Sequence, residues 1–500
     1  MRPGKSQQSI PRQKWIVVSI LAVSLLLRWI LILRGGQYYI ADETRYEVSR
    51  DVARLLAQGQ VGEALKQLAI SPEHIGFKVV GIVPALIEQI TGPSLAGPAM
   101  YFSLFSVLNL YLIFILSQRT SRSSAEPIFA LILAACSHSL LYYSRHLFPY
   151  DLSMSFGLLA LYAVLAGKNF IKTSLICGGL SFLCFITYNG YWAWSAFVLL
   201  ANILFSSETI TRLLQKTLVT AIGFLTPLAL LIFVMLGAGT DMISLYRLFA
   251  TSITQGNFQE GWSLPFEYFW HAEYLFILIL AILSIIAIIR PTKEQRPIVT
   301  LWASGIMFIY ICLFVSSVIL QEFVVYGRLA RQMIPFLILL AANGLTQMEQ
   351  GKFAKYRLSG IVLSLAMVQA AWNFGLSYQL YYPRQVTEDL QAQFPRFEFS
   401  TKRLAYGAPT VCQSGGYAIE NAKYFLGAPD TTQPIAGESL WEAPHPLNFL
   451  PYQYEGYTPE QRREFRKQHL QMRFYKVDEE FMSDANPDWL AIKNCMIDEK

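Results

Sequence analysis

The sequence predicts an α-helical polytopic membrane protein that carries a C-terminal soluble domain of the α/β or α+β class. Of its 500 residues, 54% are hydrophobic and only 15% are charged, whereas soluble domains carry about 25% charged residues. Apolar runs of about twenty residues recur along the chain, and each is long enough to cross about 30 Å of hydrocarbon as a helix. Near residue 377 the composition changes abruptly, and charged residues, prolines and glycines become frequent.

The apolar runs predict about eleven transmembrane helices. The first run contains Arg28 and is followed by no small-residue cleavage site, so we interpret it as a retained anchor and not as a signal peptide. The predicted spans are Trp15–Leu33, Ala96–Leu116, Pro127–Tyr143, Leu152–Ala166, Thr173–Tyr188, Tyr191–Phe205, Thr217–Leu236, Ala272–Ile289, Ile298–Leu320, Arg331–Thr346 and Leu358–Phe374.

Basic residues in the short loops predict the orientation of the chain, because Lys and Arg accumulate on the cytoplasmic side of a membrane. They precede the first span and then occupy every second connection, at positions 119–122, 168–172, 212–216, 290–296 and 352–357. The other connections and the C-terminal region therefore face the outside. The net charge of +6 follows mostly from this pattern and indicates no nucleic-acid partner. We expect a prokaryotic plasma membrane, since the sequence shows no large lumenal inserts.

Two domains are predicted on this basis. Residues 1–376 form a transmembrane core, which includes an outer loop at 34–95 with amphipathic helices, and residues 377–500 form a soluble extracytoplasmic domain. In this second domain we expect a helix over Ala418–Phe425 after a turn at 414–417. Cys412 and Cys495 also fall there. They form either a disulfide, as an oxidising compartment allows, or two unpaired thiols.

The outer loop begins with a charged segment, Ala41-Asp42-Glu43-Thr44-Arg45-Tyr46, about eight residues after the first span. Apolar residues from Tyr46 to Leu56 then follow helical spacing, which predicts an amphipathic helix with carboxylates at its start. One interpretation makes Asp42 a helix cap that accepts bonds from the first free amides. The other makes it a functional carboxylate.

Further charged residues gather at the same predicted interface, where desolvation makes them costly and favours a functional role. Each also has a structural alternative. Asp151 can cap the span that follows Pro149, and cations at span boundaries can extend to the lipid headgroups. The residues concerned are Lys78 in the outer loop, Arg145, His146 and Asp151 in the second outer turn, and Arg328 and Arg331 before a later span.

Aromatic residues cluster near the outer ends of the spans. We interpret them as an interfacial belt in preference to a surface on which sugars stack. The residues are Tyr188, Tyr191, Trp192, Trp194, Trp262, Tyr268 and Trp270.

The segment Ala-Asp-Glu-Thr-Arg-Tyr and the helix after it resemble the first-loop signature of the C-superfamily of membrane glycosyltransferases. The similar branch holds protein O-mannosyltransferases and lipid A aminoarabinose transferases. The resemblance extends to Gly92-Pro93-Ser94, to the turn that ends at Asp151 and to the segment Arg328–Pro335, and so covers about the first 170 residues and, weakly, the remaining core. In place of the family's prolines after its conserved Lys, this chain has Val79 and Val80.

The resemblance implies transfer of a monosaccharide from a polyprenyl-phosphate donor to a hydroxyl acceptor on the extracytoplasmic face. In that family the residue at the position of Asp42 is the catalytic acid-base group, and the counterpart of Lys78 contacts the lipid phosphate. Such a reaction needs a carboxylate to take the acceptor proton, a role for Asp42 with Glu43 assisting and Asp151 orienting the acceptor. The leaving phosphate needs cations, such as Lys78, Arg328 and Arg331.

Other roles stay open at this stage. Arg45, Arg145 and His146 are possible helpers, and a divalent metal on Asp42 or Asp151 is a second way to neutralise the leaving phosphate. The acceptor is a glycolipid, a polysaccharide or a protein, and membrane lipids surround the core. The alternative function is a transporter or flippase for a lipid-linked substrate, which predicts ionisable groups in mid-span and broken or repeated helices. A catalytically inactive scaffold is a third possibility.

Overall fold

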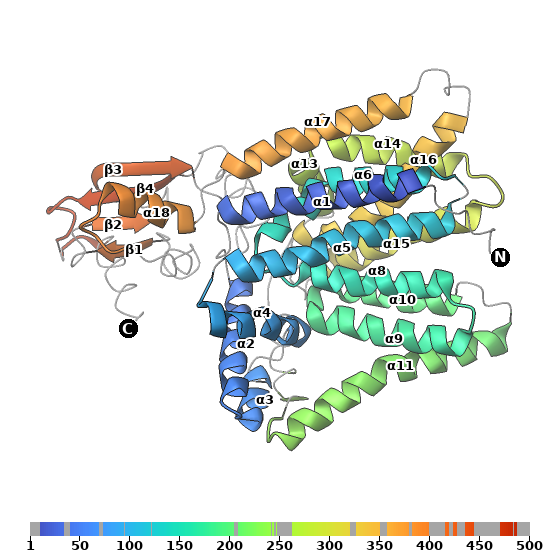
Figure 1. Ribbon diagram of the computed structural model, residues 1–500, viewed down its shortest axis with the longest axis horizontal. Coiled ribbons are helices and arrows are strands. Elements are labelled where there is room, and N and C mark those ends of the chain that lie inside the picture. Colours follow the sequence, from blue (N-terminus) through green and yellow to red (C-terminus); the bar gives the residue numbers. More distant parts are fainter. Residues whose placement is uncertain are drawn as a thin grey trace.

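The computed structural model of the chain is a helical bundle with a small sheet domain beside one end (Figure 1). It describes residues 11–34, 41–69, 74–94, 96–121, 123–204, 209–241, 243–244, 247, 263–320, 327–350, 358–379, 383–399, 416–419, 424–427, 436–444, 471–483 and 485–487.

All eleven predicted spans coincide with helices. The bundle consists of α1 (Pro11–Arg34), α5 (Ala96–Thr120), α6 (Glu126–Cys136), α7 (His138–Tyr142), α8 (Tyr150–Ala166), α9 (Phe170–Thr187), α10 (Trp192–Leu204), α11 (Ile210–Gly237), α13 (Leu264–Glu273), α14 (Leu275–Ile289), α15 (Arg296–Phe314), α16 (Ile334–Gln350) and α17 (Leu358–Gln379). Short helical turns lie between them: η1 (Tyr143–Arg145), η2 (Asn189–Tyr191), η3 (Val315–Ile319) and η4 (Gly327–Met333).

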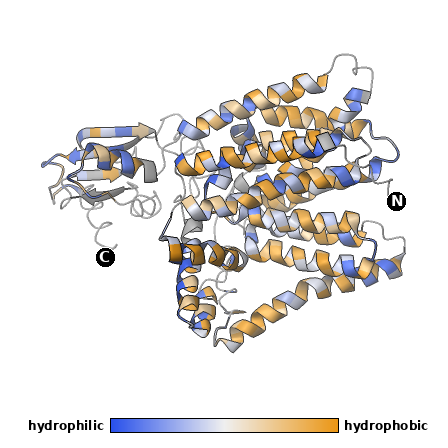
Figure 2. Ribbon diagram, viewed as in Figure 1, coloured by the Kyte–Doolittle hydropathy of each residue, from blue (hydrophilic) through white to orange (hydrophobic). Residues whose placement is uncertain are grey.

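Within the described part of the chain, seven helices are long and apolar enough to cross a membrane, and up to nine when each bent pair counts as one span. The remaining two predicted spans, α8 and α10, are shorter, with 17 and 13 residues. Hydrophobic residues cover the bundle helices, whereas hydrophilic residues concentrate in the sheet domain and near helix ends (Figure 2). The predicted fold class is therefore confirmed.

The core of the bundle surrounds the segment Leu329–Glu349. In its most apolar stretch of 18 residues 94% of the residues are buried, whereas in the corresponding stretch of α11 only 17% are buried. Large side chains such as Trp194 and Trp302 pack around Phe336 of this segment. Local sequence fixes where several helices start. Asn169 caps α9 by accepting from the amides of Ile171 and Lys172, and Thr209 caps α11 in the same way.

Two spans are bent. The axis of α6 makes an angle of 64° with the axis of the helical segment formed by α7 and η1. The axes of α13 and α14 differ by 117°. The second bend lies at Tyr274, whose φ of 50° is in the left-handed region that non-glycine residues rarely adopt. At the first bend the Ser137 side chain accepts from the amide of Leu140 at 3.4 Å, so it caps the new helix.

Three helices of the outer loop, α2 (Ala41–Ala57), α3 (Val61–Ala69) and α4 (Ile75–Thr91), lie at the left-hand end of the bundle in Figure 1. The end of α1 is at this same end, and so is the end of α17, because Arg34 donates to the carbonyl of Tyr378 at 3.3 Å. The sheet domain follows α17 at this end of the bundle (Figure 1).

The C-terminal domain contains α18 (Pro383–Gln393) and four strands, β1 (Gly416–Ile419), β2 (Tyr424–Gly427), β3 (Gly437–Pro444) and β4 (Gln471–Val477). The strands form one sheet in the order β1-β2-β4-β3, and all three pairings are antiparallel. Val386 and Leu390 of α18 pack on Leu426 and Phe474 of the sheet. This arrangement is the α+β alternative.

The helix predicted over Ala418–Phe425 is wrong. Its two ends belong to β1 and β2, which pair with Ile419 opposite Tyr424. Pairing of a short segment with a neighbouring strand overrides local propensity, which is a weak guide to strands. Cys412 and Cys495 lie outside the described residues, and the division of the chain at residues 376 and 377 stays a prediction.

Candidate active site

The carboxylates that the sequence singles out stand at the start of α2. Asp42 and Glu43 belong to its first turn, and their side chains lie outside the described part of the structure. The buried face of α2 includes Tyr46, Val52 and Ala53, so the predicted amphipathic helix is confirmed. Its position at the bundle end (Figure 1) places Asp42 and Glu43 on the side where the ends of α1 and α17 meet.

Helix α4 packs closely against α2. A Cβ atom at Gly81 would lie 2.5 Å from the Ser49 hydroxyl oxygen and 3.1 Å from the Ser49 Cβ atom, so a larger residue there would displace the Ser49 side chain. That hydroxyl donates to the carbonyl of Lys78 at 2.9 Å. The side chain of Lys78 is entirely buried. The alternative in which Lys78 extends to the lipid headgroups is therefore wrong, because such a residue keeps its charged end in water.

An ion pair fastens the same two helices. Arg50 of α2 donates to both carboxylate oxygens of Glu88, from Nε at 2.8 Å and from Nη2 at 2.9 Å. The Tyr46 hydroxyl also donates a hydrogen bond to Oε2 of Glu88 at 3.1 Å. Burial, reinforced by the negative charge of Glu88, raises the pKa of the Tyr46 phenol. A two-pronged Arg–carboxylate pair fixes geometry as well as charge, so it holds the α2 helix that carries Asp42.

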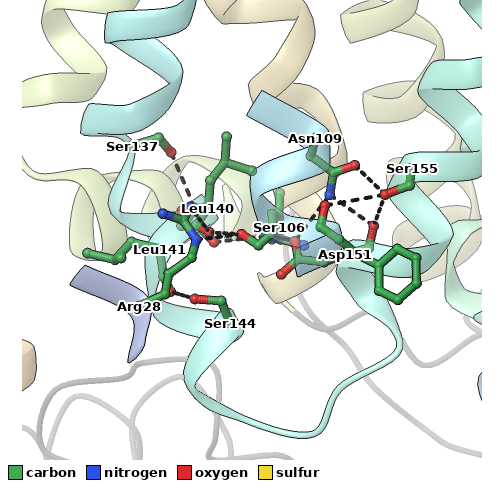
Figure 3. Close-up of polar contacts among 12 residues, drawn as sticks. Arg28, Ser106, Asn109, Ser137, Leu140, Leu141, Ser144, Asp151 and Ser155 are labelled. Carbon is green, nitrogen blue, oxygen red and sulfur yellow. Dashed lines mark hydrogen bonds and ion pairs between the residues drawn. The ribbon is translucent and has the colours of Figure 1, made fainter. Parts of the chain in front are cut away.

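Asp151 and Arg331 form a second, buried ion pair. The Asp151 carboxylate at the start of α8 accepts from Nη2 of Arg331, and Asn109 donates to its carbonyl at 2.9 Å and to its Oδ1 at 3.4 Å. Ser155 donates to Oδ1 of Asn109 at 2.8 Å, which completes the polar cluster on the right of Figure 3. No side chain caps α8, so the alternative in which Asp151 is an N-cap is wrong.

The guanidinium of Arg331 is bound at all three nitrogens. Besides Asp151, its Nε donates to the Ser139 carbonyl at 2.8 Å and its Nη1 to the Tyr191 hydroxyl at 3.2 Å. The group also lies 5.3 Å from the Tyr143 ring centre. A phosphate would have to compete with these partners. The geometry therefore favours a positioning role for both members of the pair, while their assignment to chemistry stays a prediction.

Arg145 and His146 are also buried at this end of the bundle. Nη1 of Arg145 donates to the Ser377 carbonyl of α17. The His146 ring contacts the Tyr142 hydroxyl through Nε2 at 3.3 Å and stacks on Phe148 with ring centres 5.0 Å apart. Arg45, on α2, is half-buried. The side chain of Arg328 lies outside the described residues.

A chain of aromatic rings links the outer loop to the Arg331 site. His74, which precedes α4, packs on Tyr188 at 4.9 Å, and Tyr188 packs on Tyr150 at 4.7 Å. Tyr150 in turn contacts Tyr143 at 5.2 Å, the ring beside Arg331. Tyr188 is buried, so its assignment to an interfacial belt is wrong. The same correction applies to Tyr191, Trp194 and Tyr268.

Trp270 is 47% exposed, as a belt residue should be, and Trp192 is half-buried. Trp262 lies outside the described residues.

Glu273 is a functional-site candidate that the sequence analysis missed. It is fully buried at the end of α13, where it accepts from the Ser137 hydroxyl at 2.6 Å and from the amides of His138 and Ser139 at 2.9 Å each. It thus caps α7, whose Ser139 holds Arg331. The available signal was an acid inside the predicted span Ala272–Ile289, because a carboxylate buried in a membrane needs partners.

The described residues around Asp151 do not fit a metal ion. No group of three or more His, Cys, Asp or Glu residues that could hold a metal occurs in the described part of the chain. The Asp151 carboxylate is already ion-paired with Arg331. Because divalent cations take several oxygen ligands, we derive no step through a metal at Asp151. A metal on Asp42 stays a prediction.

No protein-family model matches the chain. No curated protein matches it either.

Among solved structures, the chain is similar to the crystal structure of ArnT from Cupriavidus metallidurans in the apo state. The sequence identity is 12% and the TM-score is 0.46, and the match covers 69% of this chain. The chain spans 62% of the length of that ArnT chain.

Proposed function

We propose that this protein is a membrane glycosyltransferase that moves a monosaccharide from a polyprenyl-phosphate donor to a hydroxyl acceptor on the extracytoplasmic face. The observation that carries the proposal is the complete burial of Lys78 on α4, the helix that packs against α2. A buried cation is costly, and a site that must stabilise a leaving phosphate gives it a use.

The proposed roles follow from placement. Asp42, at the start of α2, takes the proton of the acceptor hydroxyl while the acceptor oxygen bonds to the anomeric carbon. Glu43 assists it. The bond between that carbon and the donor phosphate breaks, and Lys78 compensates the negative charge that grows on the phosphate oxygen. The wall beside this site is formed by side chains that are held in place by their partners: Asp151, Arg331, Arg145 and His146.

The acceptor approaches from the outer side in this proposal. A prokaryotic plasma membrane as the location, with the N-terminus in the cytoplasm, belongs to the same proposal, as does the family assignment to the C-superfamily of glycosyltransferases. The residues Asp42, Glu43, Lys78 and Asp151 support it, because a base, an assisting acid and a buried cation are the groups that sugar transfer from a phosphate donor requires.

One observation favours a second candidate, a transporter or flippase for a lipid-linked substrate. The α6–α7 and α13–α14 spans are both broken, and Glu273 at one break caps the helix that starts at the other. Broken helices that expose their termini to a substrate are typical of transporters. Here a protein carboxylate occupies the helix terminus, so we rank this candidate second.

Sugar transfer in membranes that contain the intact chain or an Asp42→Asn variant tests the proposal. A panel of polyprenyl-phosphate sugars serves as donor, with native lipids and proteins as acceptors. Because loss of general-base catalysis costs about 10²–10⁴-fold in rate, we expect Asp42→Asn to lower transfer by at least about a hundredfold. The matched control is Asp51→Asn, on the same helix, whose carboxylate pairs with exposed Arg54.

The control variant should transfer sugar at the rate of the intact chain, and both variants should elute as folded protein in size-exclusion chromatography. Equal transfer by Asp42→Asn and the intact chain would reduce Asp42 to a helix cap. Absence of transfer by the intact chain across the whole donor panel, together with uptake of a lipid-linked sugar into vesicles, would support the transporter instead.

A further inference from the structure

A cavity of about 510 Å³ lies between α1, α6, α7 and α17. Its size is within the range of about 300–1,000 Å³ that is usual for ligand pockets. It is separate from the α2–α4 junction, because no residue of those two helices lines it. Val23 and Met367 line the cavity and are 55% and 51% exposed, so it opens on the outer surface of the bundle. In a membrane this surface faces lipid.

The polarity of the lining changes along the cavity. Apart from Ser19, the lining towards the middle of the bundle is apolar and includes Ile20, Val23 and Ile132, whereas Arg28 and Asn373 lie at the other part. Arg28 precedes the end of α1 by six residues, a distance of about 9 Å along a helix. The polar part therefore lies near the level where headgroups meet hydrocarbon. This order, polar towards the outside and apolar inwards, is that of a membrane lipid.

Arg28 supplies a positive charge whose direct hydrogen-bond partners are neutral groups. Its guanidinium donates from Nε to the Ser106 hydroxyl at 2.9 Å and from Nη2 to the Leu140 carbonyl at 3.1 Å (Figure 3). Nη1 donates to the Ser24 carbonyl at 2.9 Å. None of the ion pairs found among the described residues includes Arg28. Since a guanidinium carries five N–H donors, two remain for a further acceptor.

Asn373 is a second indication of a ligand, independent of Arg28. It is 1% exposed, and its Nδ2 has no hydrogen-bond partner among the described residues, although its Oδ1 accepts from Gln369 at 3.0 Å. A buried amide donor without a partner costs about 1–3 kcal/mol. An anionic oxygen in the cavity would accept from Asn373 and from Arg28 together.

We propose that this cavity binds one phosphate-bearing membrane lipid, with its phosphate at Arg28 and Asn373 and an acyl chain along Ile20, Val23 and Met367. Phosphate fits because the planar guanidinium fork matches its oxygens. The apolar part of the cavity, open to the surrounding hydrocarbon, admits the chain. The site is separate from the residues assigned to sugar transfer.

Photolabelling tests the proposal on the full chain, purified in a non-ionic detergent so that no other lipid phosphate competes. The probe is phosphatidylglycerol with a diazirine on its acyl chain, and diacylglycerol with the same chain is the uncharged comparison. We expect phosphatidylglycerol to label peptides that contain Val23 and Met367 about tenfold more than diacylglycerol, since a charge-assisted hydrogen bond supplies at least that difference in affinity.

Three variants sharpen the test. Arg28→Gln should lower labelling by phosphatidylglycerol to the level of diacylglycerol, and Ala370→Trp, which fills the cavity from α17, should abolish labelling by both probes. Leu365→Trp is the matched control, because Leu365 lies on the same helix and is 56% exposed but does not line the cavity. It should leave labelling unchanged. If Arg28→Gln does not fold, Ala370→Trp and its control still decide.

Several outcomes would overturn the proposal. Equal labelling by the two probes would show that the phosphate does not contribute to binding. Labelling that Ala370→Trp leaves unchanged, or that spreads to peptides of other exposed helix faces, would show that the lipid does not bind in the cavity. Competition by inorganic phosphate at concentrations that abolish labelling would identify a free anion, and not a lipid, as the occupant.

Discussion

At the scale of single residues, the charges buried at the end of the bundle that carries α2 are held by specific partners. Asp151 and Arg331 compensate each other, and Glu273 accepts from two amides and a hydroxyl. A buried charge that loses its partner is far more costly than the pair is favourable. Stability measurements on single substitutions therefore separate residues that support the site from residues that react.

Asp151→Asn removes the charge that compensates Arg331 while it keeps the side-chain volume. We expect a destabilisation of about 3–5 kcal/mol, because Arg331 is then left buried and uncompensated. Thermal unfolding followed by size-exclusion chromatography measures the effect. The double variant Asp151→Asn with Arg331→Gln should be destabilised by less than the sum of the single variants. An unfolding temperature of Asp151→Asn equal to that of the intact chain would contradict the buried pair.

Glu273→Gln weakens the cap of α7. We expect a loss of about 1–3 kcal/mol, because one of the two carboxylate oxygens is replaced by a donor that cannot accept from the amides of His138 or Ser139. Glu267→Gln is the matched control, since Glu267 is on the same helix but exposed. A thermal shift assay compares the two variants. If both unfold at the same temperature, Glu273 does not stabilise the bend.

At the scale of elements, the junction of α2 and α4 determines where Asp42 is held. The two helices meet at Gly81, against Ser49, and the Arg50–Glu88 pair fastens them. The sequence predicted α2 from its apolar spacing. It could not predict that Glu88, in an apolar stretch of the outer loop, is the partner of Arg50, because the two residues are 38 positions apart and only the fold brings them together.

Gly81→Val tests this junction. Its side chain would enter the space of the Ser49 side chain, and overpacking of this kind costs about 1–3 kcal/mol. We expect faster hydrogen exchange of the α2 amides. Gly62→Val, on α3, is the control, because a Cβ atom there meets nothing within 4 Å. Adding Ser49→Ala to Gly81→Val should restore part of the protection. Unchanged exchange in α2 of the Gly81→Val variant would show that the contact does not hold the helix.

At the scale of the whole molecule, hydrophobic run length was sufficient to locate helices at all eleven predicted positions, of which seven to nine are long and apolar enough to cross a membrane among the described residues. It was insufficient for their shape, since the bends at Ser137 and Tyr274 depend on a cap and on one backbone conformation. For the site, the sequence indicated which charges gather at one end. It did not indicate that Asp151 and Arg331 would neutralise each other, because the two residues are 180 positions apart and only the fold brings them together.

The arrangement of the whole chain makes a prediction about sidedness. The basic loops lie at the end of the bundle opposite to α2, since Gln13 at the start of α1 contacts the 123–124 turn while Arg34 at its other end contacts Tyr378. Basic loops stay in the cytoplasm, so α2, α3 and the sheet domain should face outwards.

Cysteine labelling in intact cells with a membrane-impermeant maleimide checks this orientation. Gly62→Cys in α3 and Glu479→Cys after β4 should be labelled from outside, because both positions are exposed and lie at the outer end. Lys168→Cys, exposed between α8 and α9, should react only after the cells are permeabilised. The buried native thiols Cys136, Cys177 and Cys184 should contribute little, and the unsubstituted chain measures any background. Labelling of Lys168→Cys in intact cells would invert the topology and move Asp42 to the cytoplasmic side, where an extracytoplasmic transfer reaction is impossible.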